Sequence, residues 1–168
     1  LESEEKLIIN EGKIYPPASI SKLPSVILAL RDIDAGKYSL DTTFSITDQH
    51  KHVDWDNLGK LEAGTKITLK EYIDEAILVS NNTAHYHLHE VVLGGAGVVN
   101  ARQLQELNID NFHLIPLKAQ VEDVGKVLKD VYTGSILSDS SREYLLKLMQ
   151  STNNTLREAI PAGIPDEA

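Results

Sequence analysis

The stretch that decides the fold is residues 63–84, AGTKITLKEYIDEAILVSNNTA. Thr68 and Glu71 form a T-x-x-E capping box, which is typical of a helix N-terminus. The apolar residues that follow recur with helical spacing and predict one buried face: Leu69, Tyr72, Ile73, Ala76 and Ile77. Asn81-Asn82 interrupts that helix and can cap a second one, which stops at Gly94-Gly95.

Toward the N-terminus the pattern changes from strand-like to helical. Residues 6–10 and 13–15 suggest two short strands around a turn. The apolar spacing from Leu23 to Leu30 predicts a helix, and Gly36 is placed to end it. Because Pro24 lacks an N–H group, it is expected to strain that helix.

Toward the C-terminus we expect three more helices. The first two cover about 97–107 and 121–131, and the third begins at a capping box formed by Ser140 and Glu143. Residues 37–67 show no clear period and are expected to form a loop with short elements. The expected fold class is therefore α+β and predominantly helical.

Composition excludes several classes of function. The chain has 168 residues, 42% of them apolar and 24% charged, which is typical of a globular domain. Its formal net charge of −9 argues against nucleic acid or an anionic membrane as the main partner. No apolar run is long enough to span a bilayer. Zero cysteines exclude a disulfide scaffold and a thiol nucleophile.

Ser19-Ile20-Ser21-Lys22 lies where the irregular N-terminal segment becomes a helix. In this S-x-x-K tetrad one helical turn places the serine and lysine side chains on the same face. A lysine whose pKa is lowered by burial can take the proton of the serine hydroxyl and so activate it. Backbone N–H groups at the helix N-terminus lie where an oxyanion would develop. The tetrad alone also fits a serine N-cap followed by a solvated lysine.

Two segments resemble the serine β-lactamases and penicillin-binding proteins, whose signatures are S-x-x-K, S-D-N and K-T-G. Residues 17–24, PASISKLP, are similar to the nucleophile helix of that superfamily. Residues 63–84 resemble the class A β-lactamase stretch that runs through G-T-x-x-T-L into S-D-N-T-A, here ending in Ser80-Asn81-Asn82. Residues 121–124 and the G-S-I-L-S turn at 134–138 resemble later helices of the family, and IPAGI at 160–164 is similar to the segment that leads into its third strand. The resemblance therefore covers most of residues 14–164.

The resemblance implies roles for five residues. Ser19 would be the acylated nucleophile and Lys22 the base that activates it. Ser80 would relay a proton toward the leaving group, and Asn82 would hydrogen-bond the amide of the substrate. Trp55 lies where class A enzymes usually place an aromatic wall of the pocket, although a lone tryptophan in a polar loop can also be a packing residue. No metal and no cofactor is implied.

The sequence departs from the family pattern at three points. Asn81 replaces the usual aspartate of S-D-N, and no K-T-G occurs in the 168 residues. Class A enzymes also use a glutamate to activate the deacylating water. Between Glu106 and Glu122 the sequence offers only Asp110, and Glu106 is expected on an exposed helix face.

Three histidines follow the second motif: His85, His87 and His89. His85 and His89 are four residues apart, a spacing that can hold a metal beside Glu90. A third ligand and an H-E-x-x-H motif are lacking, so a solvated helix face is the favoured interpretation.

We therefore expect a single, incomplete β-lactamase/transpeptidase-like domain over residues 1–168. Residues 1–36 would hold the early strands and the nucleophile helix, 37–154 the helical part, and 155–168 the start of a further sheet segment. The expected function is an acyl-transferring serine hydrolase that acts on β-lactams or D-alanyl cell-wall peptides and deacylates slowly. The alternatives are a non-catalytic β-lactamase-like binding module and a histidine-based metal-binding module.

The resemblance also implies partners and a location. The partner would be a small-molecule β-lactam or D-alanyl peptide, with no nucleic acid and no membrane span in this chain. Association through an uncovered sheet edge is a further expectation. Proteins of this superfamily are usually exported, which predicts an extracytoplasmic location.

Overall fold

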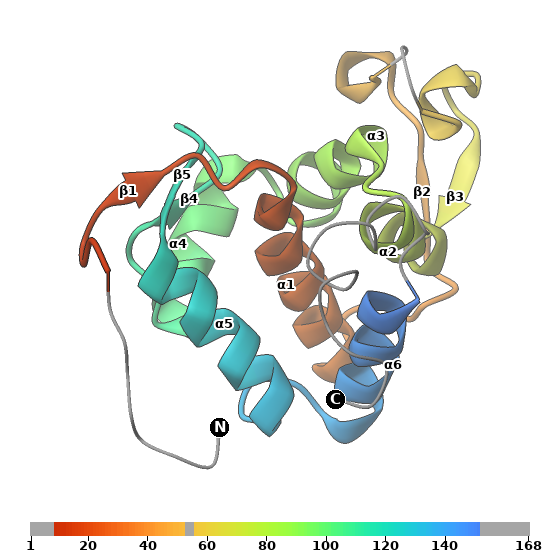
Figure 1. The fold of residues 1–168 in the computed structure, drawn as a ribbon. Coiled ribbons are helices and arrows are strands. Elements are labelled where there is room, and N and C mark those ends of the chain that lie inside the picture. The colour runs from red at the N-terminus through yellow and green to blue at the C-terminus, as the bar shows by residue number, and fades with distance from the viewer. Residues whose placement is uncertain (1–8, 53–55, 152–168) are drawn as a thin grey trace.

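The computed structural model describes residues 9–52 and 56–151 (Figure 1). Its α-helices are α1 (Lys22–Asp34), α2 (Leu69–Leu78), α3 (Asn82–Tyr86), α4 (Ala96–Leu107), α5 (Val121–Thr133) and α6 (Asp139–Gln150). Shorter helical turns are η1 (Ala18–Ser21), η2 (Asp48–His50), η3 (Leu58–Lys60) and the π-helical η4 (His87–Val92). The strands are β1 (Ile14–Tyr15), β2 (Thr43–Ser45), β3 (Lys66–Thr68), β4 (Phe112–His113) and β5 (Lys118–Gln120). The fold class is thus α+β and mostly helical, as predicted.

The strands form two small antiparallel sheets. One has the order β1-β5-β4, and in it Tyr15 lies opposite Ala119. The other pairs β2 with β3. The expected N-terminal pair of strands is not found, because β1 pairs with β5 and residues 9–10 form a bend; residues 6–8 lie outside the described part.

Helix α1 lies at the centre of the described fold, with α2, α4, α6 and η4 packed around it (Figure 1). Every residue from Lys22 to Leu30 is buried. Burial on all sides is unusual for a helix of a chain this size and fixes its position tightly. The first turn of α1 therefore provides a rigid support for the side chains that it carries. Within the described ranges, no helix is both long and apolar enough to cross a bilayer.

Helix α2 begins as its sequence predicts. The Thr68 hydroxyl accepts a hydrogen bond from the Glu71 N–H, and the Glu71 carboxylate accepts one from the Thr68 N–H. Such a cap contributes roughly 1 kcal/mol to stability. It also anchors the N-terminus of the helix that leads into Ser80.

The start of α6 differs from the prediction. The N-cap is Ser138 and not Ser140, because the Ser138 hydroxyl accepts from the Ser141 N–H while donating to the Asp34 carboxylate at the end of α1. A tertiary partner on α1 thus moves the helix start two residues upstream of the predicted capping box.

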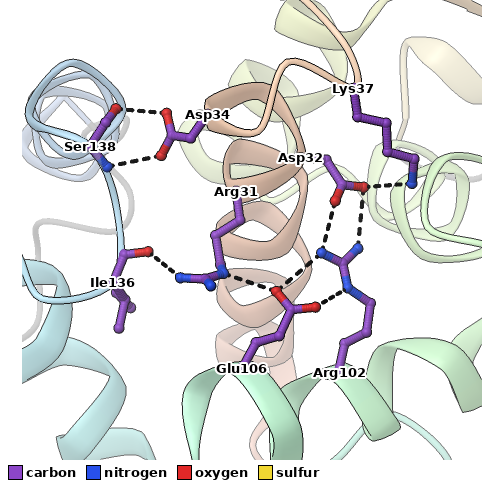
Figure 2. Close-up of polar contacts among 8 residues, drawn as sticks. All are labelled: Arg31, Asp32, Asp34, Lys37, Arg102, Glu106, Ile136 and Ser138. Carbon is purple, nitrogen blue, oxygen red and sulfur yellow. Dashed lines mark hydrogen bonds and ion pairs between the residues drawn. The ribbon is translucent and has the colours of Figure 1, made fainter.

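The C-terminal half of α1 is held by a network of charged groups, shown in Figure 2. The Arg31 guanidinium donates to Glu106 at 2.9 Å and to the Ile136 carbonyl at 2.7 Å, and Arg102 donates to Asp32 at 2.8 Å. Hydrogen bonds from Arg102 and Arg31 hold the pKa of Glu106 below its usual value, against the effect of burial. The expectation that Glu106 lies on an exposed face is therefore wrong: it joins α4 to α1.

Candidate active site

Ser19 lies in η1, immediately before α1. Ala18 has a φ of 47°, in the left-handed region, and the Ser21 hydroxyl donates to its carbonyl at 2.7 Å. This tight turn presents Ser19 to solvent while α1 starts at Lys22. Pro24 then falls in the first turn of α1, where a missing N–H group is tolerated, and the expected strain does not arise.

Three polar side chains converge on Ser19. The Ser80 hydroxyl donates to Ser19 Oγ at 2.8 Å. Lys22 Nζ lies 3.3 Å from Ser19 Oγ and donates to Asn82 Oδ1 at 2.9 Å. Four of the five residues predicted for the site, Ser19, Lys22, Ser80 and Asn82, therefore form one connected hydrogen-bond cluster. The fifth, Trp55, lies outside the described residues.

Lys22 is buried, with 4% of the residue's surface exposed. Burial lowers the pKa of Lys22, and the negative charge of Asp56 partly opposes that effect. A lowered pKa increases the fraction of neutral amine near neutral pH, and only the neutral amine can accept a proton from Ser19.

The segment Ser80-Asn81-Asn82 forms a strained turn between α2 and α3. Ser80 has a φ of 58°, which for a residue with a β-carbon costs on the order of 1 kcal/mol. The Asn81 side chain accepts from the Ala84 N–H at 2.8 Å and so caps α3. The turn thereby directs Ser80 and Asn82 toward α1, so the helix cap and the cluster around Ser19 use the same residues.

A pocket of about 360 Å³ opens beside Ser19 and Lys22. Its walls are Ala18, Ser21, His52, Asn82, His85, Tyr86, His89, Leu114, Ile115 and Leu117. The face formed by residues 114–117 is apolar, and none of the lining residues in the described part of the chain carries a carboxylate. Asp110, the acid found in this stretch of sequence, is exposed and does not line the pocket.

The interpretation of His85, His87 and His89 as a solvated helix face is wrong. Their exposed fractions are 9%, 0% and 3%. Successive helical residues are about 100° apart, so side chains at i and i+2 point to nearly opposite sides, and three alternate histidines cannot all share one outer face. The alternate spacing in the sequence therefore already indicated that at least one of the three histidines faces the protein interior.

Each of the three rings has a different environment. The Thr47 N–H donates to His87 Nε2 at 2.9 Å, so His87 must carry its proton on Nδ1, which donates to the Thr83 carbonyl at 2.8 Å. The His85 and His89 rings lie 4.8 Å apart. Among residues 9–52 and 56–151, neither ring nitrogen of His89 has a hydrogen-bond partner, although Nδ1 lies 3.3 Å from the Glu90 carboxylate.

Burial keeps these histidines neutral. It lowers the pKa of His85 to about 3, because a second positive charge would be unfavourable beside His89 and Lys22 as well as costly to bury. It also lowers the pKa values of His87 and His89. In the described parts of the chain, no group of three or more histidine, aspartate or glutamate side chains is arranged to hold a metal.

Sequence reasoning also missed Asp56, which lies one position after Trp55. The residue is 5% exposed, and its carboxylate accepts a hydrogen bond from the N–H of Thr83, one residue beyond Asn82, at 2.7 Å. No motif in the sequence marks it, because its partners come from a segment that is distant along the chain.

Comparison with known proteins gives relatives of one kind. The VEB-1 β-lactamase of Pseudomonas aeruginosa is 25% identical in sequence, over an alignment that covers 94% of this chain. A β-lactamase structure from Chitinophaga pinensis is 26% identical, with a TM-score of 0.80 over 94% of the chain. The penicillin-G acyl-enzyme of a PBP-A L158E mutant is 24% identical, with a TM-score of 0.89 over 99% of the chain, and shares its fold.

This chain spans 59% of the length of VEB-1, 65% of the Chitinophaga enzyme and 64% of PBP-A. The model of the β-lactamase enzyme family matches residues 1–168 in full. Together with the helical fold and the cluster around Ser19, this match shows that the chain belongs to the β-lactamase enzyme family.

Proposed function

We propose that this chain carries the acylating part of a serine hydrolase that attacks β-lactams or D-alanyl cell-wall peptides through Ser19. The observation that carries the proposal is the hydrogen-bonded cluster of Ser19, Lys22 and Ser80 at the mouth of a pocket. A serine hydroxyl needs an adjacent base to become a nucleophile, and a buried lysine amine beside it meets that need.

The chemistry follows from the contacts. Neutral Lys22 Nζ takes the hydroxyl proton as Ser19 Oγ attacks the amide carbonyl carbon of the substrate. Ser80, hydrogen-bonded to Ser19 Oγ, gives its hydroxyl proton to the leaving nitrogen as the C–N bond breaks, and the proton that Lys22 took from Ser19 replaces it, so that Lys22 and Ser80 both end neutral. The Asn82 amide, already oriented by Lys22, offers a donor to the amide group of the substrate. The product is an ester of Ser19.

Release of that ester is expected to be slow. Hydrolysis needs a base beside the attacking water, and losing a positioned base typically costs ~10²–10⁴-fold in rate. The pocket wall formed by Leu114, Ile115 and Leu117 supplies no carboxylate. The acyl-enzyme should therefore accumulate, which is the behaviour of a penicillin-binding protein and not of a rapid β-lactamase.

Labelling with a fluorescent penicillin tests the proposal. The complete gene product that contains residues 1–168 should form a covalent adduct, visible by intact mass and lost in Ser19→Ala. The exposed Ser140→Ala variant is the control and should be labelled like wild type. Rapid turnover without a detectable adduct would refute slow release, and neither adduct nor turnover would favour a non-catalytic binding module.

A carboxylate added to the apolar wall tests the explanation for slow release. Ile115→Glu places an acid on the pocket wall and should speed loss of the adduct by about 10-fold or more. Val121→Glu, at an exposed apolar position outside the pocket, is the matched control and should leave the release rate unchanged.

We also propose an extracytoplasmic location, because D-alanyl cell-wall peptides lie outside the cytoplasmic membrane. Fractionation of cells after penicillin labelling tests it: the labelled protein should be in the extracytoplasmic fraction, and label confined to the cytoplasm would refute the proposal.

A further inference from the structure

Hydrogen-bond donors in and next to the Ser80-Asn81-Asn82 segment hold the Asp56 carboxylate in place. It accepts hydrogen bonds from the Thr83 N–H at 2.7 Å and from the Gly59 N–H at 3.1 Å, and the polar side chains of Thr83 and Asn81 also lower its pKa. Burial opposes ionisation of Asp56, but these hydrogen bonds outweigh it and hold its pKa below the usual value. Asp56 is therefore a buried negative charge attached to the Ser80-Asn81-Asn82 turn.

Asn81, at the middle of that turn, lies between two carboxylates. Its Nδ2 donates to Glu75 at 3.0 Å, and its side chain helps to hold the pKa of Asp56 below the usual value. An aspartate at this position would lose the donor to Glu75 and bring a third negative charge close to Glu75 and Asp56. A neutral side chain at position 81 therefore avoids electrostatic repulsion with the carboxylate at position 56.

The same carboxylate acts on the base of the proposed reaction. Burial lowers the pKa of Lys22, and the charge of Asp56 raises it. The side chain of Asp56 also fixes Thr83, which directly follows Asn82, a hydrogen-bond partner of Lys22. Asp56 thereby links the position of the turn to the protonation of the lysine.

We propose that Asp56 is a positioning residue of this site, which takes the place of the aspartate in the S-D-N motif and couples the Ser80-Asn81-Asn82 turn to Lys22. The inference rests on the proposed acylation of Ser19. It explains the departure at Asn81 as a relocation of the carboxylate to a neighbouring segment rather than as its loss.

A charge exchange tests the proposal. Asp56→Asn and Asn81→Asp should each slow acylation by a fluorescent penicillin about 10- to 100-fold, the typical effect of misplacing reacting groups. The double variant Asp56→Asn/Asn81→Asp moves the carboxylate back into the motif and should recover at least about 10-fold over Asn81→Asp. Asp48→Asn, an exposed aspartate on the same segment, is the control and should acylate like wild type.

The pH profile of acylation separates positioning from a purely structural role. The acylation rate should fall at acidic pH as Lys22 becomes protonated, and this fall is the acid limb of the profile. Removing the Asp56 charge in Asp56→Asn should lower the pKa of Lys22 and so move the acid limb to lower pH. Asp56→Glu keeps the charge and should leave the acid limb in place even if the rate falls. The titratable groups that face Lys22 are Asp56 itself and the pocket-lining His52, His85, Tyr86 and His89. None of the variants alters the four pocket residues.

The outcomes are distinct. If wild type forms no adduct on Ser19, the proposed function is refuted and this inference with it. If wild type acylates but the double variant is no faster than Asn81→Asp, or the acid limb of Asp56→Asn does not move, this inference alone is overturned. Should Asp56→Asn fail to fold, the double variant must fold and acylate, and a double variant that also fails refutes the proposal.

Discussion

Acid should destabilise this protein through its buried histidines, and His85 allows the size of the effect to be worked out. His85 lines the pocket beside Ser19, with Nε2 3.5 Å from the Ser25 hydroxyl. Burial lowers its pKa from 6.5 to about 3. The unfolded chain therefore binds a proton at this residue throughout the interval between those values, and the folded protein does not.

The sign follows from that difference. A depressed folded pKa favours the folded state above the unfolded value, and the benefit is lost as pH falls from about 6.5 toward about 3. Between pH 7 and pH 5 the loss from His85 alone is about 2 kcal/mol. His87 and His89, whose pKa values are also lowered, add to it. Carboxyl groups titrate mainly below pH 5, so this interval reports on histidines.

Urea unfolding at pH 7 and pH 5 measures the effect. Wild type should lose about 2 kcal/mol or more between the two conditions, and His85→Gln should lose about 2 kcal/mol less than wild type does. The control Ile73→Val, a buried change without a titratable group, should lower stability by about 1 kcal/mol equally at both pH values. Equal pH dependence in wild type and His85→Gln would refute the assignment of a neutral, buried His85.

Three further outcomes are expected. Lys22→Arg should abolish adduct formation in the penicillin assay while the thermal melt stays cooperative, because arginine keeps its proton near neutral pH; acylation at the wild-type rate would exclude Lys22 as the base. Gly59→Ala should lower the melting temperature and slow acylation, because a β-carbon there would lie 2.3 Å from the His52 carbonyl oxygen, and an unchanged melt would show that the segment relaxes freely. Thr68→Ala should cost about 1 kcal/mol in urea unfolding by removing the α2 cap, with Thr133→Ala, near the end of α5, as a control that loses less.

The parts of the fold that local chemistry dictates could be predicted from the sequence. The capping box of Thr68 and the buried face of α2 depend on residues within one or two turns, and both are found. The partner of β1 and the cap of α6 could not be predicted, because each depends on a distant segment: β5 in one case and Asp34 in the other.

The same division holds for the site. The S-x-x-K spacing and the resemblance singled out Ser19 and Lys22, which the structure brings together with Ser80, while the roles of these residues stay predictions. The alternate spacing of the three histidines already excluded one shared outer face, but the partner of His87, Thr47, lies on another segment and could not be predicted. Asp56 was missed because a single aspartate in a polar loop gives no periodic or motif signal.

The left-handed backbone at Ser80 has a consequence for how this protein would evolve in the laboratory. Glycine adopts that conformation without penalty and asparagine nearly so, whereas serine does not. Selection for heat resistance alone should therefore enrich glycine at position 80, and selection for penicillin binding should enrich serine. A scan of all substitutions under both regimes should find the two rankings in opposition at this position, because the hydroxyl that serves the reaction is attached to the β-carbon that strains the chain.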